Sequence, residues 1–428
     1  MPRPAHLLMT CVVALLGIGV VMVHSAGLSV ATAEIDANAF DPSMTVGGVL
    51  APLINKNLVY ALMAVGAMLV GSRVDLRGIF QTRGWWNPVW FAVLISLGLC
   101  AMTLVPGWGK EVNGAARWLT IGPAGLPGGG ISFQPSELMK WTLVVGLAWY
   151  CARRRGVMHR FWWGLLPGLL LVGLACGLIV IEDLGTAALI GAVALCVLVA
   201  GGARVWQLAL MLPFAVGAVV AAILHSPYRI KRLTAFMDPW ADHQGTGYHP
   251  IQSMLAFAQG GVEGNGLGKS IQKYYIPEDT TDFVFPIIAE ELGFGGAVLV
   301  VGLFLAILWV GFGIAKDSKD MFGRLVAIGV LLTVGLQAVI NLAVVTVVVP
   351  TKGIALPLIS AGGTGWIITA FALGLVASLD NARVMEVQGE GLQHGDAEAQ
   401  RRGEVDRAGS NGFKTNPTSV SGGVVSSS

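Results

Sequence analysis

Long apolar runs separated by short polar connectors dominate the pattern of this 428-residue chain. A helix of about twenty apolar residues can cross the roughly 30 Å hydrocarbon core of a bilayer. About ten runs meet that criterion, and they lie near 7–29, 53–72, 88–105, 135–152, 161–181, 184–202, 205–224, 284–315, 323–349 and 358–379. The pattern therefore predicts an all-α polytopic membrane protein with about ten transmembrane helices.

Composition agrees with that class of protein. Hydrophobic residues make up 54% of the chain, charged residues make up 12%, and the mean hydropathy is +0.70. Charged residues are roughly a quarter of a typical soluble protein. The composition thus excludes an ordinary soluble globular protein, while the net charge of +2 says little about partners.

The basic residues of the connectors predict the orientation. With the N-terminus inside, the inner connectors hold most of the short-loop cations: Arg73, Arg77, Arg83, Arg153, Arg154, Arg155, Arg160, Arg204, Lys316, Lys319, Arg324 and Arg383. The alternate connectors are poor in Lys and Arg, apart from the loop 225–283, and long loops escape the positive-inside rule. Both termini are therefore expected inside, with the long loop outside before the eighth helix.

The two ends of the chain need separate interpretation. Arg3, the first apolar run and Ala31-Thr32-Ala33 resemble a signal peptide with a cleavage site, but the run is longer than a usual signal core, which favours a retained span. Residues 385–428 are rich in Gly, Ser, Glu and Gln and predict a disordered cytoplasmic tail. Residues 1–384 are expected to form the transmembrane domain.

Several kinds of chemistry lack their usual signatures. The five cysteines lie in or at the ends of apolar runs without a CxxC pair, as small buried hydrophobic residues do. His243 and His249 share the long loop but have no Cys or His-Glu partners for a zinc site. A Walker loop, a dinucleotide fingerprint and a GxSxG elbow are not visible. The chemistry is therefore expected in the outer connectors.

The outer connector 106–134 leads directly into a charged helix start. Pro135 suits the first position of a helix, and Glu137 and Lys140 then lie on one face just inside the membrane boundary. An ion pair that stabilises the helix is the simplest interpretation, but ionisable groups within a span usually face a polar cavity. Arg117, upstream in this connector, has a guanidinium suited to bidentate phosphate binding.

The loop 225–283 combines basic and aromatic side chains. Its basic residues are Arg229, Lys231, Arg232, Lys269 and Lys273, interleaved with Tyr228, Phe236, Trp240, Tyr248, Tyr274 and Tyr275. Such a surface suits anionic lipid headgroups or a phosphorylated lipid that carries sugars. Residues 251–258 predict a short amphipathic helix in the interface, and the glycines between 260 and 268 predict tight turns.

Candidate carboxylates lie at the end of this loop and in the next apolar run. A later outer connector contains prolines and glycines that interrupt a helix. Asp282 stands at the mouth of a membrane domain, where a carboxylate is costly, and is therefore a functional candidate. Glu290 and Glu291 come two turns further into the next span and need buried partners. In the third outer connector, prolines and glycines interrupt the apolar sequence of 350–364, which includes Lys352 and indicates a re-entrant or cavity-lining element.

These motifs together resemble the SEDS family, the FtsW/RodA-type peptidoglycan glycosyltransferases. The matching segments run in order from about 110 to 365 and include Phe133-Gln134-Pro135-Ser136-Glu137-x-x-Lys140, Tyr228-Arg229 to Arg232, Asp238-Pro239-Trp240, Gln252-Ser253, Gly264-x-Gly266-Leu267-Gly268, Thr281-Asp282-Phe283, Glu290-Glu291-Leu292-Gly293, Gln337 to Asn341 and Pro350-Thr351-Lys352-Gly353. The long loop is more similar to the cell-division branch, FtsW, than to the elongation branch, RodA.

A few positions depart from the family pattern. Thr280 replaces the usual His two residues before Asp282, and it cannot titrate near neutrality. Glu182 replaces the Pro of a Pro-Asp pair. Ala116 replaces a residue that is often basic, and Ala361 and Gly365 replace a Tyr and a Ser. The Asp, the Glu-Lys pair and Arg117 are retained.

The resemblance implies a polymerase that links lipid II units into glycan strands, with loss of undecaprenyl pyrophosphate, on the outer face of the inner membrane. Asp282 is then expected to act as general base toward the acceptor sugar. Arg117, Lys140 and Lys352 are expected to meet the pyrophosphate, with Glu137 holding Lys140. A divalent cation, Mg²⁺ or Mn²⁺, would serve the same purpose, although no metal-ligand spacing is visible.

Substrate contacts are also expected from Arg229 and Lys273 in the long loop. The resemblance further implies a class B penicillin-binding transpeptidase and other divisome membrane proteins as partners, and no nucleic acid. A lipid II flippase, an elongation-type polymerase and a non-catalytic division scaffold stay open as alternatives. Against a flippase, the sequence shows no clear pair of inverted repeats with matching broken helices.

Overall fold

A computed structural model shows how these segments pack. It describes residues 3–34, 56–82, 87–105, 109–112, 115–121, 131–275, 282–361 and 363–385. The chain separates into two units, Met1–Asn381 and Ala382–Ser428, and the structural account below concerns the first. Apart from Met385, the expected tail lies outside the described residues.

Every predicted apolar run contains a helix. In chain order these are α1 (Pro4–Glu34), α3 (Lys56–Gly71), α5 (Pro88–Thr103), α6 (Pro135–Arg153), α7 (Leu166–Glu182, preceded by the π-helical turn η2, Phe161–Leu165), α8 (Leu184–Ala200), α9 (Val205–Leu224), α12 (Val284–Asp317), α13 (Met321–Val345) and a last helix, Thr364–Met385. A short helix, α4 (Leu76–Gln81), follows α3. Among the described residues, six helices are long and apolar enough to cross a membrane: α1, η2 with α7, α9, α12, α13 and the last helix. The prediction of a helical polytopic membrane fold is confirmed.

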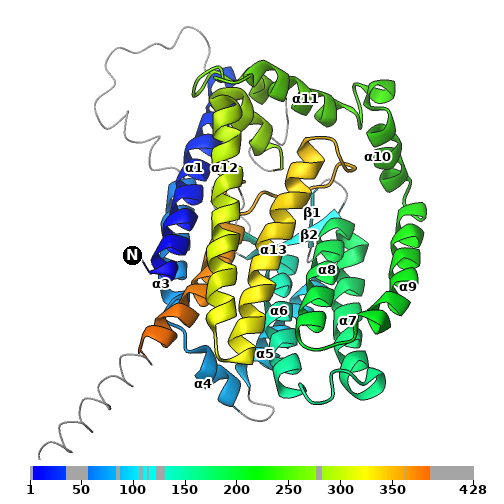
Figure 1. Ribbon diagram of the computed structural model, residues 1–428. Helices are drawn as coiled ribbons and strands as arrows, with labels where there is room; N and C mark the ends of the chain where they lie inside the picture. The colour runs from blue at the N-terminus through cyan, green and yellow to red at the C-terminus, as the bar shows by residue number, and fades with distance from the viewer. Residues whose placement is uncertain are drawn as a thin grey trace, which may run out of the picture. The chain divides into compact units, whose positions relative to one another are not determined.

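The long loop contains helices of its own. They are α10 (Pro227–Met237), the 3₁₀ turn η3 (Pro239–Asp242), α11 (Tyr248–Gly260) and the 3₁₀ turn η4 (Gln272–Tyr274). The short helix expected at 251–258 lies within α11, which packs against α12 and buries Ile251. The hydroxyl of Ser253 donates a 2.5 Å hydrogen bond to the carbonyl of Val345 at the end of α13. Figure 1 shows α10 and α11 together at one end of the helices.

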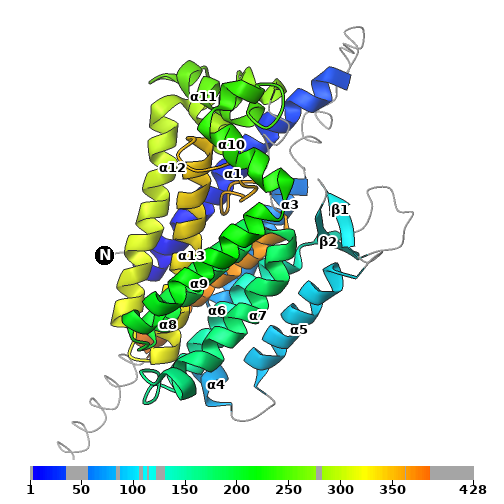
Figure 2. The ribbon, with the colours of Figure 1, turned by 90° about the vertical axis from the view of Figure 1, so that its right-hand side faces the viewer.

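A small antiparallel sheet precedes α6. Its strands β1 (Gly109–Val112), β2 (Ala115–Ile121) and β3 (Ile131–Phe133) lie in that order, with Leu119 of β2 opposite both Gly109 and Phe133. The hydrophobic pattern predicted only a glycine-rich connector here. Because Phe133 lies two residues before Pro135, the sheet anchors the start of α6, next to α5 (Figure 2).

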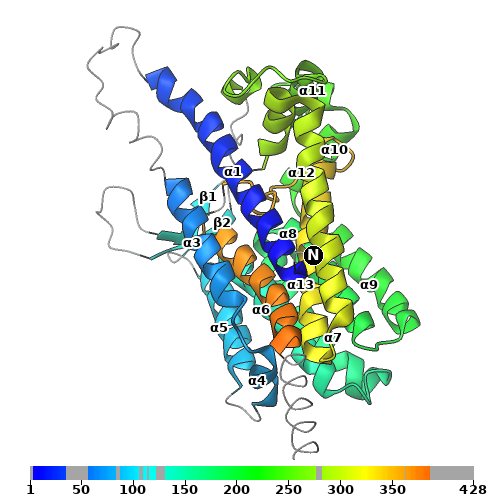
Figure 3. The ribbon, with the colours of Figure 1, turned by 60° about the vertical axis from the view of Figure 1, so that its left-hand side comes forward.

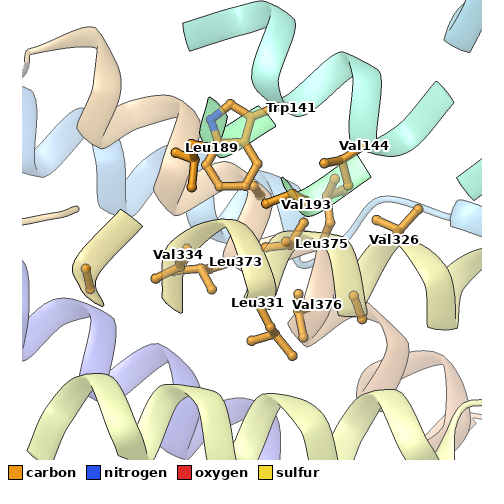
Figure 4. Close-up of a cluster of buried hydrophobic side chains, with 14 of the residues drawn as sticks. Trp141, Val144, Leu189, Val193, Val326, Leu331, Val334, Leu373, Leu375 and Val376 are labelled. Atoms are coloured by element: carbon orange, nitrogen blue, oxygen red, sulfur yellow. The ribbon is translucent and has the colours of Figure 1, made fainter. Parts of the chain in front are cut away.

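The apolar core lies between α6, α8, α13 and the last helix. Figure 4 shows branched aliphatic side chains and one indole meeting there: Trp141, Val144, Leu189, Val193, Val326, Leu331, Val334, Leu373, Leu375 and Val376. Lipid tails are as apolar as these side chains, so the helices are held by close van der Waals packing rather than by exclusion from water.

The first helix belongs to this packed unit. α1 runs between α3 and α12 (Figure 3), and it buries Leu8, Val12 and Leu15 in the core. Its Ser25 hydroxyl donates hydrogen bonds of 2.8 and 3.0 Å to the two carboxylate oxygens of Glu291 in α12. The span that the sequence favoured as retained therefore supplies a polar contact to the carboxylate of Glu291, which the long loop also contacts through the N–H of Ser270.

Glu290 and Glu291 have the buried partners that their position requires. Glu290 accepts hydrogen bonds from the Ser270 hydroxyl and, at 2.8 Å, from the backbone N–H of Ile271. Glu291 accepts from Ser25 and from the backbone N–H of Ser270 at 3.4 Å. Buried carboxylates are tolerated when donors surround them, and these two join α12 to α1 and to the end of the long loop.

A break in α12 lies directly after these carboxylates. Gly293 has φ +66° and ψ −165°, so α12 consists of two helical pieces. The helix carbonyls freed at this point accept other donors: the N–H of Asn265 bonds the carbonyl of Glu290, and the N–H of Gly266 bonds that of Glu291, each at 2.9 Å. The kink therefore has an identifiable cause, which is loop backbone inserted into the helix ladder.

Replacing Gly293 by Ala should destabilise the fold by about 2 kcal/mol or more. Gly293 has positive φ, and a Cβ there would overlap the carbonyl of Val262 and come within 2.5 Å of the amide nitrogen of Gly264. Thermal unfolding of the purified protein in detergent measures the effect. Gly295→Ala is the control, because a Cβ at that position meets nothing within 4 Å. Equal unfolding midpoints for the two variants would contradict the role of the kink.

Candidate active site

The start of α6 places an acid and a base together, as the spacing predicts. Gln134 is the N-cap residue and Pro135 occupies the first turn, followed by Glu137 and Lys140 one turn apart. The Lys140 Nζ lies 2.8 Å from Glu137 Oε2. Lys140 is only 2% exposed, whereas Glu137 is 20% exposed. The pair therefore has a buried cation and an anion closer to the surface.

Lys140 has a second acceptor on another helix. Its Nζ donates a 2.8 Å hydrogen bond to Gln337 Oε1 of α13. The amide nitrogen of Gln337 then donates at 2.9 Å to the carbonyl of Ala355. A buried ammonium without such acceptors is very unfavourable, so Gln337 completes the surroundings of Lys140 and ties them to residue 355.

Asn341, one helical turn after Gln337, makes a matching pair of contacts. Its Nδ2 donates to the carbonyl of Asp282 at 2.9 Å and to the carbonyl of Ile354 at 2.7 Å. Residues four apart on a helix lie on the same face. One face of α13 therefore holds two backbone segments together: residue 282, just before α12, and residues 354–355, after α13.

The carboxylate of Asp282 is half-buried and lies against Gly353. Its Oδ2 is 2.9 Å from the position that a Cβ of residue 353 would occupy. A side chain at 353 would therefore crowd the carboxylate, which gives a physical reason for the glycine. The consecutive residues Gly353, Ile354 and Ala355 contact Asp282 and the two amide side chains of α13.

The segment 350–361 is non-helical and largely buried. Its turn is closed by side chains: Ser360 Oγ accepts from the Leu356 N–H at 2.7 Å, and the Ser360 carbonyl accepts from Trp366 Nε1 at 2.6 Å. Arg232 of α10 donates to the carbonyl of Thr351 at 3.4 Å. Lys352 is half-buried between Thr351 and Gly353. Irregular backbone at membrane depth requires such cover.

Two of the expected substrate-binding residues, Arg229 and Lys273, make their described contacts with other parts of the chain. Arg229 donates to the carbonyls of Ala222 and Val180, each at 2.9 Å, at the C-terminal ends of α9 and α7. Lys273 is buried, and its Nζ donates to the carbonyls of Gly268 at 2.8 Å and Ser25 at 3.4 Å. Cations satisfy helix-end carbonyls well, and these contacts hold Arg229 and Lys273 to the scaffold.

Other expected site residues are only partly covered by the structure. The backbone of Arg117 lies in β2, and nothing is described of its side chain. Thr280 lies outside the described residues. Within the described part of the chain, no three His, Cys, Asp or Glu side chains gather in a way that would hold a metal ion. Among the described residues, basic side chains near this site are Lys140 of α6, Lys352 of the segment 350–361 and Arg232, which contacts Thr351 of that segment.

Gln337 and Asn341 are site residues to which the motifs assigned no role. Two amide side chains four residues apart in an apolar span were the available signal, because polar residues within a membrane helix usually face a functional interior. Their partners lie 197 residues away, at Lys140, and 59 residues away, at Asp282.

Helices long enough to span a membrane and a cluster of buried ionisable residues define a polytopic membrane protein with a polar site in its helix bundle. The chain belongs to the FtsW, RodA and SpoVE family of cell cycle proteins, whose profile matches residues 5–384. The resemblance indicated by the motifs is therefore confirmed.

Two proteins of similar sequence share the name probable peptidoglycan glycosyltransferase FtsW. A probable peptidoglycan glycosyltransferase FtsW from Nitrosococcus halophilus is 37% identical over 388 residues, which cover 89% of this chain and 92% of that protein. The protein of the same name from Thioalkalivibrio sulfidiphilus is 38% identical over 370 residues, covering 85% of this chain and 86% of that protein.

Solved structures extend the similarity to the fold. A structure described as the structural coordination of polymerization and crosslinking by a peptidoglycan synthase complex matches with a TM-score of 0.65 and 27% identity, covering 88% of this chain and 97% of that chain. The crystal structure of the rod shape determining protein RodA from Thermus thermophilus matches with a TM-score of 0.58 and 25% identity, covering 88% and 96% of the two chains.

The Asn341→Asp variant should be less stable by about 2 kcal/mol or more, since a carboxylate cannot donate to the carbonyls of Asp282 and Ile354. Thermal unfolding in detergent measures the loss, and hydrogen exchange should rise in 350–361. Thr346→Val is the control, because this exposed threonine bonds only the carbonyls of its own helix. Unchanged exchange in 350–361 of Asn341→Asp would show that Asn341 does not hold the segment.

Proposed function

We propose that this protein is a peptidoglycan glycosyltransferase that polymerises lipid II during cell division. The observation that carries the proposal is the meeting of Asp282, the Glu137–Lys140 pair and the segment 350–361 on one face of α13. The names of its relatives from Nitrosococcus halophilus and Thioalkalivibrio sulfidiphilus support the same activity and the division branch.

The membrane arrangement is part of this proposal. We assign all ten helices of the predicted apolar runs to spans of the bacterial inner membrane, with both termini in the cytoplasm and residues 385–428 as a tail. The arginines of the inner connectors support this orientation through the positive-inside rule. It directs the site and the long loop to the outer side, where the nascent glycan lies.

Asp282 acts as general base in the proposed reaction. Its carboxylate takes the proton of the acceptor sugar's 4-hydroxyl as that oxygen attacks the anomeric carbon of the growing chain. The bond from this carbon to the phosphate oxygen breaks, and undecaprenyl pyrophosphate leaves. A base in this role must be held at hydrogen-bond reach of the proton, and Asn341 and Gly353 support that placement of Asp282.

Negative charge grows on the leaving pyrophosphate, and cations stabilise it. Lys140 is held in place by Glu137 and Gln337, so its charge needs little reorganisation during the reaction. Lys352 is nearer the surface and neighbours Gly353, and we also assign Arg117, whose backbone lies in β2, to binding the pyrophosphate. We assign Arg229 and Lys273 to holding the scaffold, on the grounds of their backbone contacts.

We also propose a class B penicillin-binding transpeptidase and other divisome membrane proteins as partners. The similar synthase complex, whose description couples polymerization with crosslinking, supports the transpeptidase. Lipid II flipping is the second candidate function, since broken helices around a polar site also suit alternating access. A liposome assay separates the two, because a flippase moves labelled lipid II across the bilayer without lengthening glycan.

Asp282→Asn should abolish glycan synthesis by the purified protein supplied with lipid II and its transpeptidase, since an amide cannot accept the proton. Gel analysis of labelled glycan measures the product, and the unfolding midpoint should stay near that of the parent. Asp242→Asn, on the exposed turn η3, is the control and should retain activity. Near-normal product from Asp282→Asn would contradict its role as the base.

Glu137→Gln should lower the polymerisation rate at saturating lipid II by about tenfold to a hundredfold, because hydrogen bonds to charged groups contribute roughly 1.5–3 kcal/mol. Rates are measured from the same gels over time. The exposed Glu263 of the long loop provides the matched control, Glu263→Gln. Equal rates for the two variants would show that the charge of Glu137 is not needed to hold Lys140.

A further inference from the structure

A cavity of about 700 Å³ lies at the other end of α6, away from Glu137 and Lys140. It is lined by Trp90 of α5, by side chains at the end of α6 that include Arg153 and Arg154, and by the first turns of α7, with Leu170, Leu171 and Leu174. Residues 137 and 153 are about 24 Å apart along the helix axis at 1.5 Å per residue. The cavity is therefore separate from the site described above.

Two arginines give this cavity a positive wall. Arg153 donates to the carbonyls of Phe80 and, at 3.4 Å, Thr82, while Arg154 Nη1 donates to the carbonyl of Trp163 at 2.6 Å. No acidic side chain of the described residues lines the cavity. In the described part of the chain neither arginine forms an ion pair with a carboxylate. Each guanidinium carries five N–H donors, and these contacts use only some of them, so donors remain on both arginines.

Aromatic rings hold these guanidinium groups in position. Arg153 lies 4.5 Å from the ring centroid of Phe80 and 5.3 Å from that of Trp149, and Arg154 lies 5.5 Å from that of Tyr150. Among the described residues, the buried Nε of Arg153 and the buried Nε1 of Trp149 have no acceptor. The lining thus has an excess of hydrogen-bond donors and positive charge, which a phosphate would complement.

A second wall of the cavity, on α7, is apolar and includes exposed side chains. Leu170 and Leu174 lie one turn apart on α7 and are 64% and 55% exposed. Trp90 meets Trp149 edge to face, with ring centroids 5.6 Å apart. A free anion would leave this wall unused, whereas a ligand with both a phosphate and a hydrocarbon chain would cover both walls.

We propose that this cavity binds one anionic phospholipid of the cytoplasmic leaflet. Its phosphate lies against Arg153 and Arg154, and an acyl chain follows Leu170 and Leu174 along α7. The volume falls in the range of small-molecule sites, roughly 300–1,000 Å³, which accommodates a headgroup and the first part of the chains. Basic pockets between membrane helices on the cytoplasmic side suit such headgroups.

Native mass spectrometry and thermal unfolding of the full-length protein in detergent test the proposal. Phosphatidylglycerol is compared with phosphatidylcholine of the same acyl chains, and with inorganic phosphate. Phosphatidylglycerol should bind as one retained molecule and raise the unfolding midpoint with concentration, about tenfold more tightly than phosphatidylcholine. Inorganic phosphate should produce no shift at the same concentration, and an equal shift would overturn the assignment to a lipid.

Matched variants distinguish binding of the lipid in the cavity from general attraction of an anionic lipid to a basic surface. Arg153→Gln with Arg154→Gln should weaken phosphatidylglycerol binding by about tenfold or more. Arg155→Gln with Arg160→Gln removes the same charge from exposed arginines outside the cavity and should bind as the parent does. Equal loss in both double variants would reduce the effect to surface attraction and overturn the proposal.

A third variant keeps the arginines and fills the cavity. Leu171→Trp adds volume at the lining of α7 and should also lose the retained lipid, at an unfolding midpoint near that of the lipid-free parent. This variant decides the question if the double arginine variant does not fold. Retention of one tightly bound phosphatidylglycerol by Leu171→Trp would overturn the proposal.

Discussion

The need to surround one buried ammonium group organises the end of this protein that carries the Glu137–Lys140 pair. Lys140 is almost completely removed from solvent and must keep permanent acceptors, because an uncompensated charge in a low-dielectric interior is prohibitively unfavourable. Glu137 provides one acceptor from its own helix and Gln337 provides the other from α13. Since Gln337 also holds Ala355, the same requirement fixes α6, α13 and the irregular segment relative to one another.

Other polar side chains of these helices form hydrogen bonds with backbone groups as well as with one another. Asn341 joins the carbonyls of Asp282 and Ile354, and the buried carboxylates of α12 take their donors from the end of the long loop and from α1. Each contact joins segments far apart in the chain. Asn341 thereby holds the backbone of Asp282 in place, as the proposed role of this residue as a base requires.

The two ends of α6 meet different physical demands. At its N-terminal end, the charge of Lys140 is enclosed by protein, so the position of Lys140 is decided by hydrogen bonds to Glu137 and Gln337. At its C-terminal end, Arg153 and Arg154 contact aromatic rings and backbone carbonyls, and the leucines of α7 form an apolar wall of the cavity beside them. Between these ends the helix is packed by branched aliphatic side chains, whose contribution is van der Waals contact.

The sequence by itself determined the helical membrane class, the place of each long apolar helix and the local pair Glu137–Lys140, because apolar run length and an i, i+3 spacing depend only on neighbouring residues. Its motifs also identified the family and singled out Asp282. Only the tertiary structure decided that Gln337 and Asn341 complete the site, that Gly353 lies against the carboxylate, and that Arg229 and Lys273 hold backbone elsewhere. Contacts between residues 59 or 197 positions apart follow from how helices pack, and hydrophobic periodicity does not specify that packing.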